Sequence, residues 1–519
     1  MRLCTGRWDL FGKIPGVGFL ALAALLFLFV ATRELDAAPA IDWDEGWTFT
    51  VAQNWVEHHF YGRLLNGQFA PPGLEASFPV VSTVALAMQL FGVGIWQGRL
   101  AAVLPMLVAL VLLWLLTRQF FDTSVAFAAL AILICLIPHP RTNAFWMARA
   151  MFAEPLQCVT ILVGFEVLLL ARRGTRLLIL AAIVFWALAF TSKAQVLPFL
   201  MVSALSAIGM NLVNHRPREA FWLGVSLGGA FIGWRLLLIL FERILAGWTL
   251  PPNVNAEIFT VAGFVPSPSI RLTAVIVTVL IGTPIVLGLG YFCVQRFARR
   301  DYLQLLDRDD DLRVALWVLA VTWLLWYVLL SQAGIVRYLF SPLFFGAPFA
   351  AVMFRDFTGG FNLKISLERM TLPLRQHAFT RTSFGAWLAF LLILFYFPLT
   401  LYLSYLTMSA AEGHDVTATA DYLNHKTPAN ARIETYESPL FIILNRSYHY
   451  PPDALHLELN KRAAQLPAKV DYDPLVSNPD YFVIGPVAHI WRLYDPLVER
   501  GDLVLLKSFG QYEIYQRTR

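Results

Sequence analysis

Charged residues are scarce in this chain of 519 residues: Asp, Glu, Lys and Arg make up 14% of it, whereas hydrophobic residues make up 58%. A soluble protein carries roughly one quarter charged residues. The charges that are present gather in short stretches between long apolar runs. This composition excludes an ordinary soluble globular domain and is typical of a chain that crosses a membrane many times.

Cysteine is also scarce, and the four residues are Cys4, Cys135, Cys158 and Cys293. All lie in or beside apolar segments, and no C-x-x-C spacing occurs. The sequence therefore predicts neither a disulfide framework nor a zinc site. The formal net charge of +5 does not indicate nucleic-acid binding. Most basic residues lie in short loops between apolar runs, where the positive-inside rule accounts for them.

Eleven apolar runs are long enough to cross a bilayer, and the first is interpreted as an uncleaved helix rather than a signal peptide. They lie near residues 14–32, 100–117, 124–142, 155–171, 176–192, 196–213, 220–241, 272–294, 314–331, 335–354 and 385–408. A twelfth run, 77–97, is interrupted by Pro79, Gln89, Gly92, Gly94 and Gln97. Whether this run crosses the membrane decides on which side of the membrane all later loops lie.

The distribution of basic residues settles this question. If 77–97 lies along the surface and the N-terminus is cytoplasmic, the inner loops hold 19 Lys and Arg, and the outer loops before residue 409 hold nine. If 77–97 crosses, the count becomes 10 inside and 18 outside. Only the first arrangement obeys the positive-inside rule. We therefore predict about eleven transmembrane helices, with 77–97 as an interfacial or re-entrant segment.

The predicted fold is a polytopic α-helical membrane protein with interfacial helices in its first outer loop and a small extracytoplasmic α/β domain. Residues 1–408 form the transmembrane part, with the first outer loop at 33–99, and residues 409–519 form the polar domain. The pattern of the second part predicts a helix near 418–424 and strands near 431–436, 481–484, 503–506 and 512–515. The outer loop 243–271 shows no periodicity.

Two neighbouring acids, Asp44 and Glu45, open an amphipathic stretch in the first outer loop. Trp47, Val51 and Trp55 follow at a spacing of four and predict one stripe of a helix lying at the membrane interface. The acids are interpreted either as residues that cap this helix and complement its dipole, or as a general base held at the membrane surface. Both interpretations stay open.

Further charged residues lie at the outer ends of later spans: Arg149, Glu154, Lys193 and Arg337, the last followed by Tyr338. Each alone is typical of an interfacial anchor. Together with the early acids they fall on one side at a similar depth. This mixture suits a substrate with an anionic head and an apolar tail, because cations hold a phosphate and a carboxylate accepts a proton.

The chain resembles the membrane-embedded glycosyltransferases of the GT-C class, and in particular the protein mannosyltransferases, the lipid A aminoarabinose transferases and the Rgt-like enzymes. The likeness covers residues 40–200 well and the helix that begins at Arg337 fairly, and it matches the C-terminal domain only in its placement. It rests on Pro71-Pro72-Gly73, Leu90-Phe91-Gly92, Gly98-Arg99-Leu100-Ala101, the run from Leu115 to Phe121, and Ala148-Arg149 with Glu154.

The resemblance implies a role for several residues. The catalytic base of the family maps onto Asp44, with Glu45 beside it, and a second acid maps onto Glu154. The family's Thr-Lys step maps onto Thr191-Ser192-Lys193, with Ser192 inserted. Many relatives carry a lysine before the Pro-Pro pair, where this chain has Ala70. Contact with the carrier phosphate therefore falls to Lys193, Arg337, Arg149 or Arg63, with Tyr338 beside them.

The function predicted from these features is transfer of a monosaccharide from a polyprenyl-phosphate donor to an acceptor hydroxyl at the outer membrane face, with inversion and with Asp44 as the base. No glycine-rich phosphate loop or dinucleotide fingerprint is present, which suits a lipid-linked donor rather than a nucleotide sugar. The acceptor is a glycan, a lipid or a protein; membrane lipids surround the chain. A divalent cation is left open as a cofactor, and no metal ligands are named.

Two alternatives stay open. A transporter or lipid flippase predicts related halves and polar residues at mid-membrane, a pattern of which only Arg235 is an example here. A non-catalytic membrane scaffold predicts that the acids are caps and that the outer domain binds partners. The predicted location is the bacterial inner membrane, with the C-terminal domain extracytoplasmic.

Overall fold

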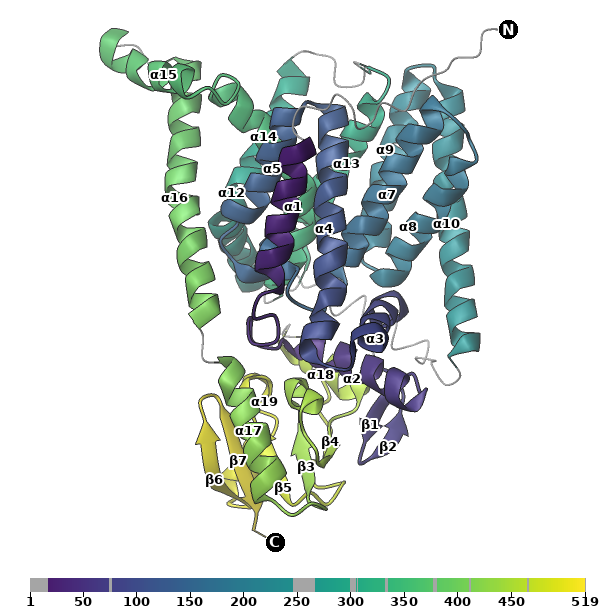
Figure 1. Ribbon diagram of the computed structural model, residues 1–519, viewed down its shortest axis with the longest axis vertical. Coiled ribbons are helices and arrows are strands. Elements are labelled where there is room, and N and C mark those ends of the chain that lie inside the picture. Colours follow the sequence, from purple (N-terminus) through teal and green to yellow (C-terminus); the bar gives the residue numbers. More distant parts are fainter. Residues whose placement is uncertain are drawn as a thin grey trace.

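The computed structural model describes residues 17–73, 77–245, 267–298, 305, 307–331, 335–376, 380–409, 412–463 and 466–518. Most of the predicted outer loop 243–271 lies outside these residues. The described helices form one upright bundle, and the strand-containing C-terminal domain lies at one end of it (Figure 1). We call this end of the bundle the proximal end and the opposite end the distal end.

Each of the eleven predicted spans coincides with one helix of the bundle. Eight of the described helices are long and apolar enough to cross a membrane, and four apolar helices are shorter. The chain is thus an integral membrane protein, while the number of helices that cross stays a prediction. The bundle helices are α1 (Val17–Thr32), α4 (Ile95–Phe120), α5 (Thr123–Cys135), α7 (Glu154–Arg173), α8 (Leu178–Ser192), α9 (Val196–Val213), α10 (Pro217–Ile244), α12 (Pro268–Ala298), α13 (Asp310–Leu329), α14 (Phe340–Phe357) and α16 (Arg381–Ser409).

The third span is shorter than the sequence predicts. Helix α5 ends at Cys135 rather than near 142, and a turn (η1, Pro140–Thr142) and a short helix (α6, Ala144–Met147) follow it. Pro138 and Pro140 explain the early end, because proline disfavours helical geometry at the preceding residue and lacks an amide hydrogen. An amphipathic helix, α15 (Leu363–Gln376), precedes α16 at the distal end (Figure 1).

The first loop at the proximal end folds into α2 (Trp43–His58), a hairpin of β1 (Arg63–Leu65) and β2 (Gln68–Ala70), and α3 (Phe78–Phe91). Asn66 and Gly67 have φ of 51° and 73°, as a two-residue hairpin turn requires. Helix α3 packs beside α2 at the proximal end (Figure 1). Its 14 residues span roughly 21 Å, less than the hydrocarbon core of a bilayer. The interfacial interpretation of 77–97 is therefore favoured.

The stripe of α2 faces protein rather than lipid, contrary to the prediction. Trp47 and Val51 are 2% and 0% exposed. The Trp47 ring packs edge-on against Phe441 and Tyr450 of the C-terminal domain. An apolar stripe on a helix is the same pattern whether a membrane or protein covers it. Here the C-terminal domain covers Trp47, and Val51 packs in a cluster with residues of α3.

The C-terminal domain contains a five-stranded sheet in the order β4-β3-β5-β7-β6. Strands β4, β3 and β5 are parallel, whereas β7 is antiparallel to both β5 and β6. The four predicted strands and the first helix are confirmed, whereas β4 and α18 were not predicted. The elements are α17 (Glu412–Lys426), β3 (Arg432–Thr435), η3 (Ser438–Ile442), β4 (Ser447–His449), α18 (Asp453–Ala463), β5 (Tyr481–Ile484), α19 (Pro486–Trp491), α20 (Asp495–Glu499), β6 (Leu503–Phe509) and β7 (Tyr512–Arg517).

The start of α2 is pressed against the segment that follows β3. A Cβ atom on Gly46 would lie 2.4 Å from the carbonyl carbon of Ser438, so only glycine fits there. The Ser438 hydroxyl donates to the Trp43 carbonyl oxygen, and the Trp43 indole donates to the Tyr436 carbonyl oxygen over 2.8 Å. These contacts fix the C-terminal domain against the residues that carry the predicted site.

Candidate active site

Four of the predicted residues meet at the proximal end, and we call them the proximal cluster: Asp44, Glu154, Lys193 and Arg337. The Lys193 Nζ lies 2.5 Å from the Glu154 Oε1. The Arg337 Nε lies 3.0 Å from the same oxygen, and its Nη2 forms an ion pair with the Asp44 Oδ2. Arg337 thus bridges the two acids, which come from segments more than 100 residues apart in the chain.

Helix ends bring these side chains to one level. Asp44 lies in the first turn of α2, which Asp42 caps by accepting the Asp44 amide over 3.1 Å. Glu154 begins α7, Lys193 follows the last residue of α8, and Arg337 lies in a single turn, η2 (Val336–Leu339), before α14. Helices of similar length that run antiparallel place such alternate ends on the same side of a bilayer.

Aromatic rings complete the surroundings of the two cations. The Arg337 guanidinium lies 4.3 Å from the centre of the Phe152 ring. The Lys193 ammonium lies 5.0 Å from the centre of the Tyr338 ring, which confirms the proximity of these two predicted residues. Each ring attracts a cation through its quadrupole and excludes water from the ion pairs.

The two acids differ in access. The Glu154 side chain is 2% exposed, whereas the Asp44 side chain is 27% exposed. Burial alone would raise the pKa of Asp44, but the charge and hydrogen bond of Arg337 outweigh it and lower this pKa. Asp44 is therefore an ionised carboxylate that a second molecule can reach, and Glu154 serves to hold the two cations.

Glu45 does not join the proximal cluster. Its carboxylate accepts hydrogen bonds from Arg99 over 3.0 and 2.8 Å and from the Met151 amide over 2.9 Å. It also accepts the Asp42 amide and so completes a capping box. Glu45 and Arg99 are both fully buried. Of the two interpretations, the helix cap therefore applies to Glu45, which also forms a structural ion pair. Its neighbour Asp44 points into the cluster.

Arg149 holds the backbone that leads into α2 instead of contacting the cluster. Its guanidinium donates to the carbonyl oxygens of Val30, Ala31, Arg33, Glu34 and Ala38 over 2.7–3.2 Å. All of its donors are directed to the protein backbone, so the predicted contact with a substrate phosphate is not supported by this geometry.

Arg63, another predicted phosphate ligand, connects the first loop to the C-terminal domain. Its two terminal nitrogens lie 3.1 and 3.0 Å from the carboxylate oxygens of Asp453. Its guanidinium also lies over the rings of Trp47 and Tyr450, at 4.9 and 5.0 Å from their centres. A bidentate pair of this kind is strong and directional, and it positions the domain rather than a ligand.

A cavity of about 540 Å³ opens beside the proximal cluster, between the bundle and the C-terminal domain. It adjoins the cluster through Asp42, next to Asp44, and through Phe152, which packs on Arg337. Its polar lining includes His139, Arg141, Asp415 and Glu437, and the end of α16 contributes Leu403 and Leu406. A molecule in this cavity would touch an apolar helix on one side and the polar domain on the other.

His456 is a residue of the site that the sequence did not predict. Its ring stacks on Trp43 with centres 5.0 Å apart, and its Nδ1 lies 2.8 Å from the Tyr436 hydroxyl. Burial lowers the pKa of His456, and the nearby charge of Asp44 opposes this shift. No local pattern indicates this role, because α18 reaches the start of α2 only through the folding of the C-terminal domain.

Metal ligation was left open by the sequence. Within the described ranges, no three His, Cys, Asp or Glu side chains converge to hold a metal ion.

Residues 79–237 match the family model described as "Dolichyl-phosphate-mannose-protein mannosyltransferase". No curated protein sequence matches the chain. Among solved structures, the fold is similar to that of ArnT from Cupriavidus metallidurans bound to undecaprenyl phosphate, with a TM-score of 0.60 and 16% identity. That match covers 96% of this chain and 97% of the ArnT chain.

A second similar structure is the oligosaccharyltransferase from Archaeoglobus fulgidus, with a TM-score of 0.50 and 14% identity. This match covers 96% of the present chain and 74% of the archaeal one. The resemblance to membrane glycosyltransferases of the GT-C class is confirmed by the family model and these two structures.

Proposed function

We propose that this protein transfers a sugar from a polyprenyl-phosphate carrier to an acceptor hydroxyl, with Asp44 as the general base. The observation that carries the proposal is the proximal cluster: an accessible carboxylate and two cations meet at one end of apolar helices, beside a cavity. ArnT and the oligosaccharyltransferase, whose folds are similar, support the choice of transferase over transporter.

The donor would place its tail along the bundle and its phosphate at Lys193 and Arg337. In the structure both cations are neutralised by Asp44 and Glu154. A phosphate that takes over one contact of Arg337 would replace Asp44, which is the more exposed partner. Arginine suits this exchange because its guanidinium offers several donors in fixed directions.

This exchange would also activate the base. Arg337 lowers the pKa of Asp44, and a carboxylate with a low pKa is a poor proton acceptor. When the donor phosphate draws Arg337 away, the pKa of Asp44 rises and the carboxylate accepts a proton more readily. The base would therefore gain strength only when the donor is bound, which would limit wasteful hydrolysis.

The chemical step would be a single displacement with inversion. The acceptor oxygen forms a bond to the anomeric carbon, its proton passes to Asp44, and the bond from that carbon to the phosphate oxygen breaks. The polyprenyl phosphate leaves as an anion against Lys193 and Arg337, so no strong general acid is needed.

The acceptor would enter the cavity between bundle and C-terminal domain. The acceptor is a lipid, a glycan or a protein, since each of these can present a hydroxyl group in the cavity. We propose that the proximal end faces the non-cytoplasmic side of a bacterial inner membrane. The 19 basic residues counted on the other side support this orientation.

The test uses the full chain in proteoliposomes with an undecaprenyl-phosphate-linked sugar, and it measures released undecaprenyl phosphate together with the mass of the modified acceptor. Mass spectrometry of envelope glycans and lipids from cells with and without the protein identifies that acceptor. Asp44→Asn should lower the transfer rate about 10²–10⁴-fold, the usual contribution of a positioned base.

Glu57→Gln is the matched control, because Glu57 is an exposed carboxylate on the same helix. It should transfer at the wild-type rate. Full activity of Asp44→Asn would refute the base assignment, and an unchanged envelope in cells that lack the protein would refute the transferase proposal.

A further inference from the structure

A second hollow, of about 360 Å³, lies at the distal end between α7, α8 and α10. Four arginines and one glutamate line it, and we call these residues the distal pocket: Arg172, Arg176, Arg218, Arg308 and Glu219. The pocket and the proximal cluster lie at opposite ends of α7, whose 20 residues span roughly 30 Å. The two sites therefore belong to opposite faces of the membrane.

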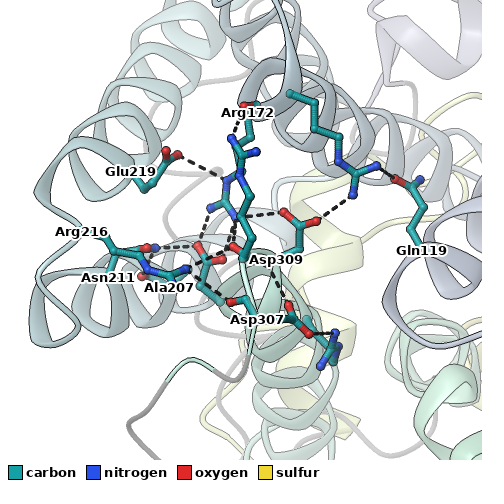
Figure 2. A network of polar contacts seen from close by, with 12 residues as sticks. Gln119, Arg172, Ala207, Asn211, Arg216, Glu219, Asp307 and Asp309 are labelled. Atoms are coloured by element: carbon teal, nitrogen blue, oxygen red, sulfur yellow. Dashed lines mark hydrogen bonds and ion pairs between the residues drawn. The ribbon is translucent and has the colours of Figure 1, made fainter. Parts of the chain in front are cut away.

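The charges of the distal pocket are only partly balanced. Figure 2 shows the polar network at this end, in which Arg172 contacts Glu219 and Asp309 and also pairs with Asp311. Arg176, Arg218 and Arg308 form no ion pair with any acid in the described part of the chain. Three positive charges thus face the hollow without a carboxylate of their own, whereas Glu219 is engaged by Arg172.

The pocket also has an aromatic wall. Arg176 lies 5.1 Å from the centre of the Trp222 ring, which lines the same hollow. Tryptophan is enriched at the boundary between hydrocarbon and headgroups, so this ring marks the level of the membrane surface. The guanidinium groups would therefore lie at headgroup depth.

Exposed apolar side chains continue from the pocket toward the middle of the bundle. Leu180 follows Arg176 by four residues and Phe221 follows Arg218 by three, so each lies about one turn deeper on its segment. Both are 61% exposed. Helices α8 and α10 pack against each other, so both side chains belong to one helix pair below the arginines.

We propose that the distal pocket binds the phosphate of an anionic phospholipid, whose acyl chains lie along α8 and α10. Arginines recognise phosphate oxygens through paired hydrogen bonds, and basic pockets between membrane helices are known to hold anionic headgroups. A free phosphate ion would use the same arginines but would leave the exposed apolar side chains beneath them without a role. The site is independent of the sugar-transfer chemistry proposed above.

The experiment uses the purified full chain in nanodiscs of phosphatidylcholine with increasing phosphatidylglycerol, and it measures lipid retention by native mass spectrometry and the thermal unfolding temperature. The double variant Arg176→Gln/Arg218→Gln should lose roughly 30-fold in apparent affinity for phosphatidylglycerol. Lys364→Gln/Arg381→Gln removes the same charge from exposed positions outside the pocket and should bind as the wild type does.

Two results would overturn the proposal. An equal loss in both double variants would show a general effect of surface charge rather than a pocket. Stabilisation by inorganic phosphate in pure phosphatidylcholine to the same extent as by phosphatidylglycerol would show a site for free phosphate. Unfolding measured in pure phosphatidylcholine separates loss of lipid binding from loss of folding in the variants.

Discussion

The two ends of the helical bundle both contain buried groups of arginines and acids, yet they differ in what surrounds those groups. At the distal end, Arg172 forms a bidentate pair with Asp311, which also accepts a hydrogen bond from Asn211 over 2.6 Å. At the proximal end, one arginine is shared between two acids, and the acid Asp44 stays accessible beside a cavity.

This difference separates an ion pair that is closed off inside the protein from one whose acid can exchange its partner. A carboxylate whose oxygens are all satisfied inside the protein, such as Asp311, has no capacity left for a substrate. A carboxylate that shares a bridging cation can exchange this partner for a ligand. Ion pairs at helix ends therefore indicate function only when one member can be reached and released.

The largest expected effect concerns folding at the distal end. Arg172→Gln leaves Asp311, whose side chain is fully buried, without its main cation. Removing one partner of a buried ion pair typically lowers the free energy of unfolding by about 3–5 kcal/mol. Thermal unfolding in detergent checks this loss, and the transfer rate per folded molecule should not change.

Arg173→Gln is the control for this prediction. Its side chain is 46% exposed, so its pair with Asp309 should contribute less than about 1 kcal/mol. If the two variants unfold at the same temperature, the buried pair of Arg172 and Asp311 does not stabilise the fold more than the exposed pair does.

The next effect concerns catalysis at the proximal end. Lys193→Gln removes one of the two cations that would hold the leaving phosphate, while Arg337 still neutralises Glu154. Loss of one such donor typically lowers a rate about 10²–10³-fold. Single-turnover transfer in proteoliposomes measures this rate, and Arg33→Gln, an exposed arginine of the same end, serves as the control. If Lys193→Gln unfolded more easily but transferred sugar at the wild-type rate per folded molecule, the ion pairs of the proximal end would be structural, like those of the distal end.

Much of the bundle could be predicted from the sequence, because the patterns that indicate a transmembrane helix and its orientation lie within one segment and the loops beside it. Apolar length predicts where helices lie, and counts of Lys and Arg predict which ends share a side. Lys193 and Arg337 were recognised because each charge stands at the end of an apolar run. The early end of α5 was missed, because the apolar run continues past Cys135 although Pro138 and Pro140 prevent a helix.

The candidate site was predicted less completely, because adjacent residues on a helix face different directions. Asp44 and Glu45 are equivalent in a sequence pattern, and only the position of Arg99, which is 54 residues away, shows which acid is occupied. Arg149 likewise resembles a free cation until the backbone that it binds is seen. His456 could not be predicted at all, because its contact with Trp43 joins segments more than 400 residues apart.

A smaller effect is expected where the proximal end meets the C-terminal domain. The Arg63 and Asp453 side chains are 7% and 23% exposed, so their pair is largely shielded from water. A double-mutant cycle with Arg63→Gln and Asp453→Asn should give a coupling of about 1–3 kcal/mol in thermal unfolding. The exposed pair of Arg500 and Asp502 should couple by less than about 0.5 kcal/mol. Additive behaviour of the first pair would mean that it does not fix the domain.

The smallest effect is a pH dependence that arises where the proximal end meets the C-terminal domain. Burial lowers the pKa of His456, although the nearby charges of Asp44 and Asp453 oppose this shift. In the unfolded chain a histidine has a pKa of about 6.5. As the pH falls below this value, His456 binds a proton in the unfolded chain but stays neutral in the folded chain until the pH is lower. The folded state should therefore lose up to about 1.4 kcal/mol of stability per pH unit.

His456→Phe keeps a ring that can stack on Trp43 but removes the group that titrates. Its unfolding temperature should fall less steeply than that of the wild type between pH 6.5 and pH 5, whereas His425→Phe, at an exposed position, should follow the wild type. If His456→Phe kept the wild-type slope, this histidine would not be the group that makes the contact between the C-terminal domain and α2 sensitive to pH.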